Sequence, residues 1–258
     1  MSSSCWGVIM ANNMDMPFEL LSPQEQQNKI LDLLRPLAPV KSEKYKKIRV
    51  GSPGDGGYVQ LDDFKNISHA FSFGISDNDS WDLEVAKRGI PVEQFDHSID
   101  CAPSSHPLLN FHKKMIATAA GPDTATLPDL VREFSKKTTP DLLLNIDIEG
   151  AEWDVFDDAS SADLNKFAQI CCEFHNLENL SHPGFFPKAK RVFDKLSENF
   201  VVVHVHGNNC CGIRNVHNIS LPCVIEFTFA NKTATPHLRA GKCFRQFWIT
   251  QTFPMSRI

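Results

Sequence analysis

The residues best suited to chemistry follow one apolar segment. Asp141–Phe156 reads DLLLNIDIEGAEWDVF, so an apolar run leads into Asp147, Glu149 and Glu152. Such a run, bounded by a proline and a glycine, predicts a buried strand of a parallel sheet. Carboxylates at its carboxyl end would lie where open α/β sheets bind ligands. The alternative is that the acids complement the dipole of the next helix. That explains Glu149 or Glu152 better than Asp147, which is still inside the run.

A second group of residues suits a nucleoside. Phe71–Ser80 (FSFGISDNDS) predicts a strand that turns at Gly74 into a helix, whose amino terminus favours negative charge. Asp96 closes the next predicted strand about twenty residues on, where nucleotide-binding folds hold ribose hydroxyls. Asp77 and Asp79 would repel phosphates. We therefore expect a cofactor without phosphates, and S-adenosylmethionine has both ribose hydroxyls and a positive sulfonium and ammonium.

Strands and helices alternate through most of the chain. This alternation predicts an α/β fold with a mostly parallel sheet, and the absence of a helix before the last strand allows an antiparallel edge. The expected strands cover 70–73, 91–95, 110–118, 142–147, 168–174, 201–206 and 223–229. The expected helices cover 80–88 with Ser80 as cap, 127–135, 149–157 and 188–199. Before them come a helix from the Ser22 cap to Pro36 and a hairpin over Arg49–Leu61, which is either a plain hairpin or closes over a ligand.

Composition excludes several classes of protein. The 258 residues carry a net charge of −5, with a pI near 6.0, which argues against a nucleic-acid partner. No apolar run reaches the roughly 18 residues of a membrane span. The first residues do not resemble a signal peptide. The eight cysteines include no CxxC pair and several lie in apolar runs, so we expect a reducing, cytoplasmic location.

Several motifs together carry a family resemblance. Asp141–Glu152 resembles the signature of the FkbM-type S-adenosylmethionine methyltransferases, in which an apolar strand ends in Asp-x-Glu-Gly-x-Glu. Leu127–Leu130 is similar to the segment that precedes it. Four other segments resemble the methyltransferase-like branch of the superfamily: Asp55–Tyr58, Phe73–Ser76, Glu173–Asn176 and His204–Asn209. The whole resemblance covers about residues 50–229.

The resemblance implies a class I, Rossmann-like methyltransferase. Its seven-stranded sheet would have the order 3-2-1-4-5-7-6, with the cofactor over the first, second and fourth strands. We expect a flexible tail over 1–22 and a methyltransferase domain over 23–258. Within it, 23–69 would hold the helix and hairpin, 70–230 the core sheet and 231–258 a C-terminal extension. The first turn lacks the family's usual Gly-x-Gly. The residues expected to bind the cofactor are Gly57, Tyr58, Phe73, Gly74, Ser76, Asp96 and Asp147.

Methyl transfer to a hydroxyl needs an aligned acceptor and removal of its proton, by a base or by a metal that lowers its pKa. Glu149, His175 and His206 are the candidate catalytic residues, and either histidine is a candidate base. Asp147, Glu173 and His175 could instead form a divalent metal site.

The expected function is O-methylation of a sugar or other small polar molecule. An N-methyltransferase acting on a small amine, a non-catalytic nucleoside-binding module and, more distantly, a nicotinamide dehydrogenase are the alternatives. The sequence names neither the acceptor nor the oligomeric state.

Overall fold

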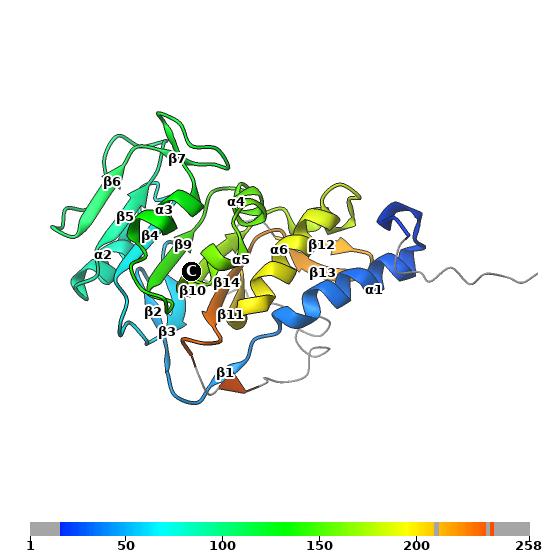
Figure 1. Cartoon of the computed structure of the whole chain (residues 1–258). Helices are drawn as coiled ribbons and strands as arrows, with labels where there is room; N and C mark the ends of the chain where they lie inside the picture. The colour runs from blue at the N-terminus through cyan, green and yellow to red at the C-terminus, as the bar shows by residue number, and fades with distance from the viewer. Residues whose placement is uncertain (1–15, 209–211, 236–237, 240–258) are drawn as a thin grey trace, which may run out of the picture.

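The computed structural model describes residues 16–208, 212–235 and 238–239 (Figure 1). Its centre is a seven-stranded sheet in the order β6-β5-β4-β9-β10-β14-β11. The strands are β4 (His69–Phe73), β5 (Val92–Phe95), β6 (Leu109–His112), β9 (Leu142–Ile146), β10 (Phe167–Phe174), β11 (Phe200–Gly207) and β14 (Ile225–Asn231). Numbered along the chain, they stand in the order 3-2-1-4-5-7-6. β14 runs in the direction opposite to the other six strands of this sheet. The prediction of an α/β fold with a mostly parallel sheet is confirmed.

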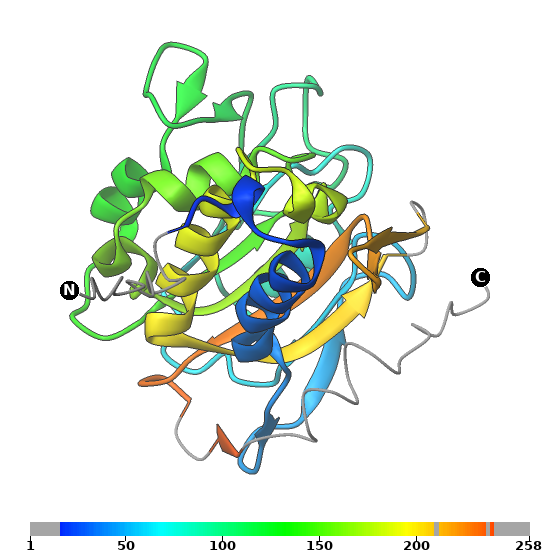
Figure 2. The same ribbon diagram turned by 90° about the vertical axis from the view of Figure 1, so that its right-hand side faces the viewer.

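Two layers cover the sheet (Figures 1 and 2). One face packs against the larger apolar core, to which α1, α3, α4 and α6 contribute, and the other against α2 and the hairpin of β2 and β3. The helices are α1 (Pro23–Leu34), α2 (Ser80–Lys87), α3 (Leu127–Phe134), α4 (Glu152–Asp158), α5 (Ser161–Leu164) and α6 (Phe186–Asn199), with 3-10 turns η1 (Phe18–Leu20), η2 (Arg35–Leu37) and η3 (Leu177–Ser181). No helix in these ranges has the length and apolar character needed to cross a bilayer.

Four small sheets lie around this core. They pair β2 with β3 and β12 with β13 as antiparallel hairpins, β1 with β15, and β7 with β8. Their strands are β1 (Lys41–Ser42), β2 (Lys47–Val50), β3 (Tyr58–Leu61), β7 (Met115–Ile116), β8 (Thr124–Ala125), β12 (Ile213–Val216), β13 (Ile219–Pro222) and β15 (Leu238–Arg239). The predicted hairpin is therefore present. The third core strand is shorter than predicted, because the chain leaves the sheet after His112 and then forms β7.

Helix starts agree with the sequence at α1 and α3 and differ at α2, α4 and α6, the last of which begins at Phe186 rather than at Lys188. Ser22 caps α1 in a capping box with Glu25, as serine before proline predicts. Ser80 is not the cap of α2 but its first residue, and its hydroxyl donates to the carbonyl of Gly56. α4 begins at Glu152 rather than at Glu149, because Glu149 has a left-handed backbone with φ of 57°.

Residues 1–15 of the predicted flexible tail over 1–22 lie outside the described residues. Within the rest, Phe18 and Leu21 are buried, and the Phe18 ring stacks on Phe186 of α6 at 4.2 Å between centroids. This part of the tail therefore packs onto the domain, contrary to the expectation. Of the predicted extension over 231–258, only 231–235 and 238–239 are described.

Candidate active site

Polar residues gather at one edge of the sheet. The parallel strands β4, β9, β10 and β11 all end there, as the sequence predicts for a shared ligand crevice. β14 runs the opposite way and begins at this edge. It thereby places Glu226 between Glu173 of β10 and His206 of β11, in register with both.

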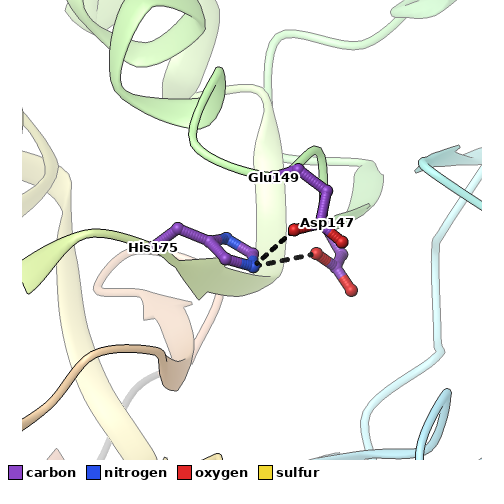
Figure 3. Close-up of side chains that lie close together, drawn as sticks. All are labelled: Asp147, Glu149 and His175. Carbon is purple, nitrogen blue, oxygen red and sulfur yellow. Dashed lines mark ion pairs between the residues drawn. The ribbon is translucent and has the colours of Figure 1, made fainter. Parts of the chain in front are cut away.

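The first cluster surrounds His175, just after β10 (Figure 3). Its Nε2 lies 3.7 Å from Oδ1 of Asp147 and 3.4 Å from Oε2 of Glu149, which both follow β9. On the other side of the ring, Nδ1 lies 3.1 Å from Oε1 of Glu152, which also accepts the backbone N–H of His175 at 2.7 Å. Glu152 is fully buried, whereas the Glu149 side chain is 87% exposed. The ring is thus held from behind by a buried acid and faces two further acids.

The charges in this cluster are strongly interdependent. Burial alone would lower the pKa of His175, but its hydrogen bond to Glu152 and the nearby acids raise it above its usual range. Burial, and next the charge of Glu173, raises the pKa of Asp147. His175 therefore favours its protonated form at neutral pH, which does not suit the predicted role of general base.

A second cluster centres on Glu173, which is 3% exposed. Tyr58 of the hairpin donates its hydroxyl to Oε1 at 3.2 Å, and Asn208 donates to Oε2 at 3.0 Å. Burial, followed by the charge of Glu173, raises the pKa of Glu226 to about 8. Burial, followed by the charge of Arg49, lowers the pKa of His206 and keeps its imidazole neutral.

The predicted metal set is not the set that converges. Asp147 and His175 come together with Glu149, not with Glu173, within 4.8 Å between ligand atoms. The two carboxylate oxygens of Glu173 instead accept hydrogen bonds from Tyr58 and Asn208. His206 pairs with Glu226 across β11 and β14 and is not one of this group.

A cavity of about 50 Å³ opens beside the Gly74 turn. Tyr58, Gly74 and Asp147, three of the residues expected to bind a cofactor, line it together with Asp82 and Asn145. Asp82 and Asn145 are 2% and 5% exposed, and Oδ1 of each has no hydrogen-bond partner within the described part of the chain. Oδ1 of Asp147, which also lines the cavity, lacks a described partner as well. Buried polar atoms normally have a partner, so these unpartnered acceptors in one cavity indicate a place for a donor.

Asp96 holds the turn that leads into this cavity. Its Oδ2 accepts the backbone N–H groups of Ile75 and Ser76 at 2.8 and 2.9 Å, and its Oδ1 accepts both the N–H and the hydroxyl of Ser98. Burial would raise the pKa of Asp96, but the hydrogen bonds from Ser98, Ser76 and Ile75 hold it at about 2. A ribose hydroxyl could reach this carboxylate only in exchange for one of these donors.

The remaining predicted cofactor residues lie differently. The Phe73 side chain is fully buried in the larger core, and its carbonyl oxygen accepts the N–H of Asp147 at 2.9 Å. The backbone of Ser76 is tied to Asp96. The Gly57 carbonyl accepts a hydrogen bond from Arg49, while its neighbour Gly56 lines the cavity.

The sequence motifs do not predict three polar residues that lie at this edge of the sheet or line the cavity: Asp82, Asn145 and Glu226. Asn145 interrupts an apolar strand two positions before Asp147, so the two share a face of the sheet, and that is a usable signal. Asp82 stands beside Trp81 and is buried like Val85 and Ala86 on the inner side of α2. Glu226 and Thr228 alternate with apolar residues in β14, but only the pairing of β14 shows which residues they face.

Comparison with known proteins places this chain in a family. One solved structure similar to it is that of the Pyrococcus abyssi tRNA (uracil-54, C5)-methyltransferase in complex with S-adenosyl-L-homocysteine, at 12% sequence identity and a TM-score of 0.30. The match covers 73% of this chain and 45% of that protein, so this chain spans less than half of its length. No curated protein matches the sequence. The family model described as the methyltransferase FkbM domain matches residues 58–199, more than half of the chain, and this protein therefore belongs to the FkbM methyltransferase family.

Proposed function

We propose that this chain is a class I, S-adenosylmethionine-dependent methyltransferase whose cofactor binds at the Gly74 turn. Membership of the FkbM methyltransferase family and the order of the sheet support this proposal. The observation that carries it is the cavity beside Gly74, with the unpartnered acceptors of Asp82 and Asn145. The ammonium end of S-adenosylmethionine offers the donors that these oxygens lack. The small volume suits this end of the ligand, while the rest would extend over the carboxyl edge of the sheet.

The bound cofactor would supply an electrophilic methyl group on its sulfonium. Tyr58, Gly74 and Asp147 would line its amino-acid end, and Asp96, through the turn of Ile75 and Ser76, would fix the approach to the ribose. Gly57 and Phe73 would act through their backbones, since the Phe73 ring belongs to the core.

The acceptor would enter from the side of β10, β14 and β11. We favour a hydroxyl of a sugar or other small polar molecule. His206, whose lowered pKa keeps it neutral, is better suited than His175 to act as the base, and the exposed Glu149 and neighbouring His175 would position the acceptor. A neutral imidazole can accept the proton that the hydroxyl loses.

A small amine is the second candidate acceptor. Asp147, Glu173 and Glu226 place three carboxyl groups along this side of the crevice, and burial raises the pKa of each. The described cationic groups near these acids are His175, beside Asp147, and the more distant Arg49, which acts on Glu226. An ammonium group placed among the three acids would therefore add a favourable charge. The acids would then orient the amine without a metal.

We further propose that residues 23–258 form one methyltransferase domain, with 23–69 as the helix and hairpin, 70–230 as the core and 231–258 as an extension. A reducing, cytoplasmic setting agrees with the exposed thiol of Cys101 and the buried thiols of Cys171 and Cys172.

Thermal stability with and without nucleosides tests the cofactor proposal. S-adenosylhomocysteine should raise the Tm of the wild type, because a ligand that binds the native state stabilises it. Methylthioadenosine lacks the amino-acid end and should raise the Tm less. In Asp82→Asn the difference between the two nucleosides should shrink. If neither S-adenosylmethionine nor S-adenosylhomocysteine shifts the Tm, the proposal is wrong.

An isotope-transfer assay over matched alcohols and amines then separates the acceptors. Label in an alcohol supports O-methylation, and label in an amine supports N-methylation. Nucleoside binding without transfer to any acceptor would instead favour a non-catalytic binding module. Stabilisation by NAD rather than by these nucleosides would point to a dehydrogenase.

A further inference from the structure

The atoms facing Nε2 of His175 are spaced as ligands of one cation (Figure 3). They are Oδ1 of Asp147 at 3.7 Å and Oε2 of Glu149 at 3.4 Å, both too far for a hydrogen bond. Two ligand atoms that each lie about 2.1 Å from one ion are separated by at most about 4.2 Å. Within the ranges that the structure describes, these three residues form the one group whose ligand atoms all approach within 4.8 Å.

The ring of His175 is oriented for this purpose from outside the group. Glu152, at 0% exposure, accepts both the ring Nδ1–H and the backbone N–H of His175 on its Oε1, while its Oε2 accepts the N–H of Gly150 at 2.8 Å. The carbonyl of His175 in turn accepts the indole N–H of Trp153 at 2.8 Å. A buried carboxylate on the far nitrogen of a histidine fixes its tautomer and directs the near nitrogen at a metal.

Asp147 supplies a further indication. Its Oδ1, the oxygen nearest Nε2 of His175, is shielded from solvent and accepts no hydrogen bond from any described residue. A buried oxygen without water or a donor is costly, and a cation is a partner that would satisfy it. The Glu149 side chain is exposed and free to turn inward, so the group can close around an ion without moving either strand.

We propose that Asp147, Glu149 and His175 bind a divalent transition-metal ion, with Glu152 as the outer carboxylate that orients His175. One imidazole and two carboxylates suit Mn²⁺ or Zn²⁺ better than Ca²⁺, which takes oxygen ligands throughout. Three protein ligands leave coordination positions for water and for one oxygen of a second molecule. The proposed binding of the ion does not depend on the proposed function. A role of the ion in holding an acceptor hydroxyl does rest on the proposed function.

Mn²⁺ titration of the full chain tests the site directly. After treatment with EDTA and removal of the chelator, loss of the free Mn²⁺ signal in electron paramagnetic resonance should show one ion bound per chain. Glu149→Gln and Asp147→Asn should each weaken binding at least tenfold. Asp154→Asn is the matched control, since this acid lies close by on α4 but pairs with Lys188, and it should bind as the wild type does.

Two measurements keep the outcomes distinct. Circular dichroism without metal checks that each variant is folded; Glu149→Gln changes an exposed side chain and should fold normally. Zn²⁺ competition against Mn²⁺ shows that both ions use one site. Absence of stoichiometric binding of either ion, or equal binding by the wild type and Glu149→Gln, overturns the inference. Stabilisation by S-adenosylhomocysteine, measured on the same samples without metal, would still stand in that case and would leave the cofactor proposal intact.

Discussion

One oxygen of Glu152 holds His175 twice, through the backbone N–H at 2.7 Å and through ring Nδ1 at 3.1 Å. The contact joins the first turn of α4 to the end of β10. The carboxylate of Glu152 is fully buried and the His175 side chain is 13% exposed, so water is a poor replacement for this contact. The position of His175 therefore depends on an acid that lies behind it rather than in the crevice.

Replacement of Glu152 should be costly for stability. Glu152→Ala leaves the N–H groups of His175 and Gly150 without their acceptor, and we expect the free energy of unfolding to fall by about 3 kcal/mol. Urea denaturation measures this change. Glu149→Gln, on the exposed side of the same ring, should change the unfolding free energy little. An equal loss in the two variants would contradict the structural role given to Glu152.

The turn at Gly74 should not tolerate a side chain. A Cβ there would lie 1.7 Å from the carbonyl oxygen of Asp147, and φ is +78°. Gly74→Ala should cost more than about 3 kcal/mol, because a backbone clash is added to the strain of the left-handed conformation. Gly89→Ala is the control: φ is +83° but the space is open, so only the strain of about 1 kcal/mol is expected. Similar losses in thermal or urea denaturation would show that the clash is relieved.

Tyr58→Phe tests the link between the hairpin and the sheet. The variant removes the only described donor to Oε1 of Glu173, a buried acid, and we expect a loss of about 1.5 kcal/mol in the free energy of unfolding. Tyr45→Phe, on a tyrosine whose hydroxyl is not part of the crevice, should have little effect. A loss for Tyr45→Phe as large as for Tyr58→Phe would argue against a specific role of the Glu173 contact.

Asp82 predicts a pH dependence of stability. Burial raises its pKa to about 7 in the folded chain, from 3.8 for an ordinary aspartate. Between these values the folded chain holds a proton that the unfolded chain has lost, so this group destabilises the fold increasingly as the pH rises from about 4 to about 7. The stability of Asp82→Asn relative to the wild type should therefore increase over this range. A constant difference across it would show that Asp82 is ionised in the folded protein.

The regular elements could be predicted because their signals are local. Ser22-Pro23 starts α1, Asp55-Gly56-Gly57 turns the hairpin, and continuous apolar runs mark β9 and β10. These patterns act over a few residues. Together they were enough to predict the mostly parallel sheet and the edge at which polar residues gather.

The arrangement within the site could not be predicted in the same way. The sequence predicts a helix from Glu149, but the left-handed backbone of this residue delays the helix to Glu152. The sequence also predicts Glu173 as a metal ligand, whereas Tyr58, from a hairpin 115 residues earlier in the chain, donates a hydrogen bond to it. Such choices depend on partners distant in sequence, which spacing along the chain does not reveal.

Because β14 runs opposite to the other strands, its first residues lie at the edge of the sheet where the other strands end. On one side of the crevice, the positions near Gly74 belong to turns that follow strands. On the other, Glu226 sits where a strand begins, immediately after the β12–β13 hairpin. Insertions or deletions in that hairpin would therefore change the surroundings of Glu226 without disturbing the turn at Gly74. Under the proposed function, relatives that bind the same nucleoside would differ in acceptor through changes in this short stretch.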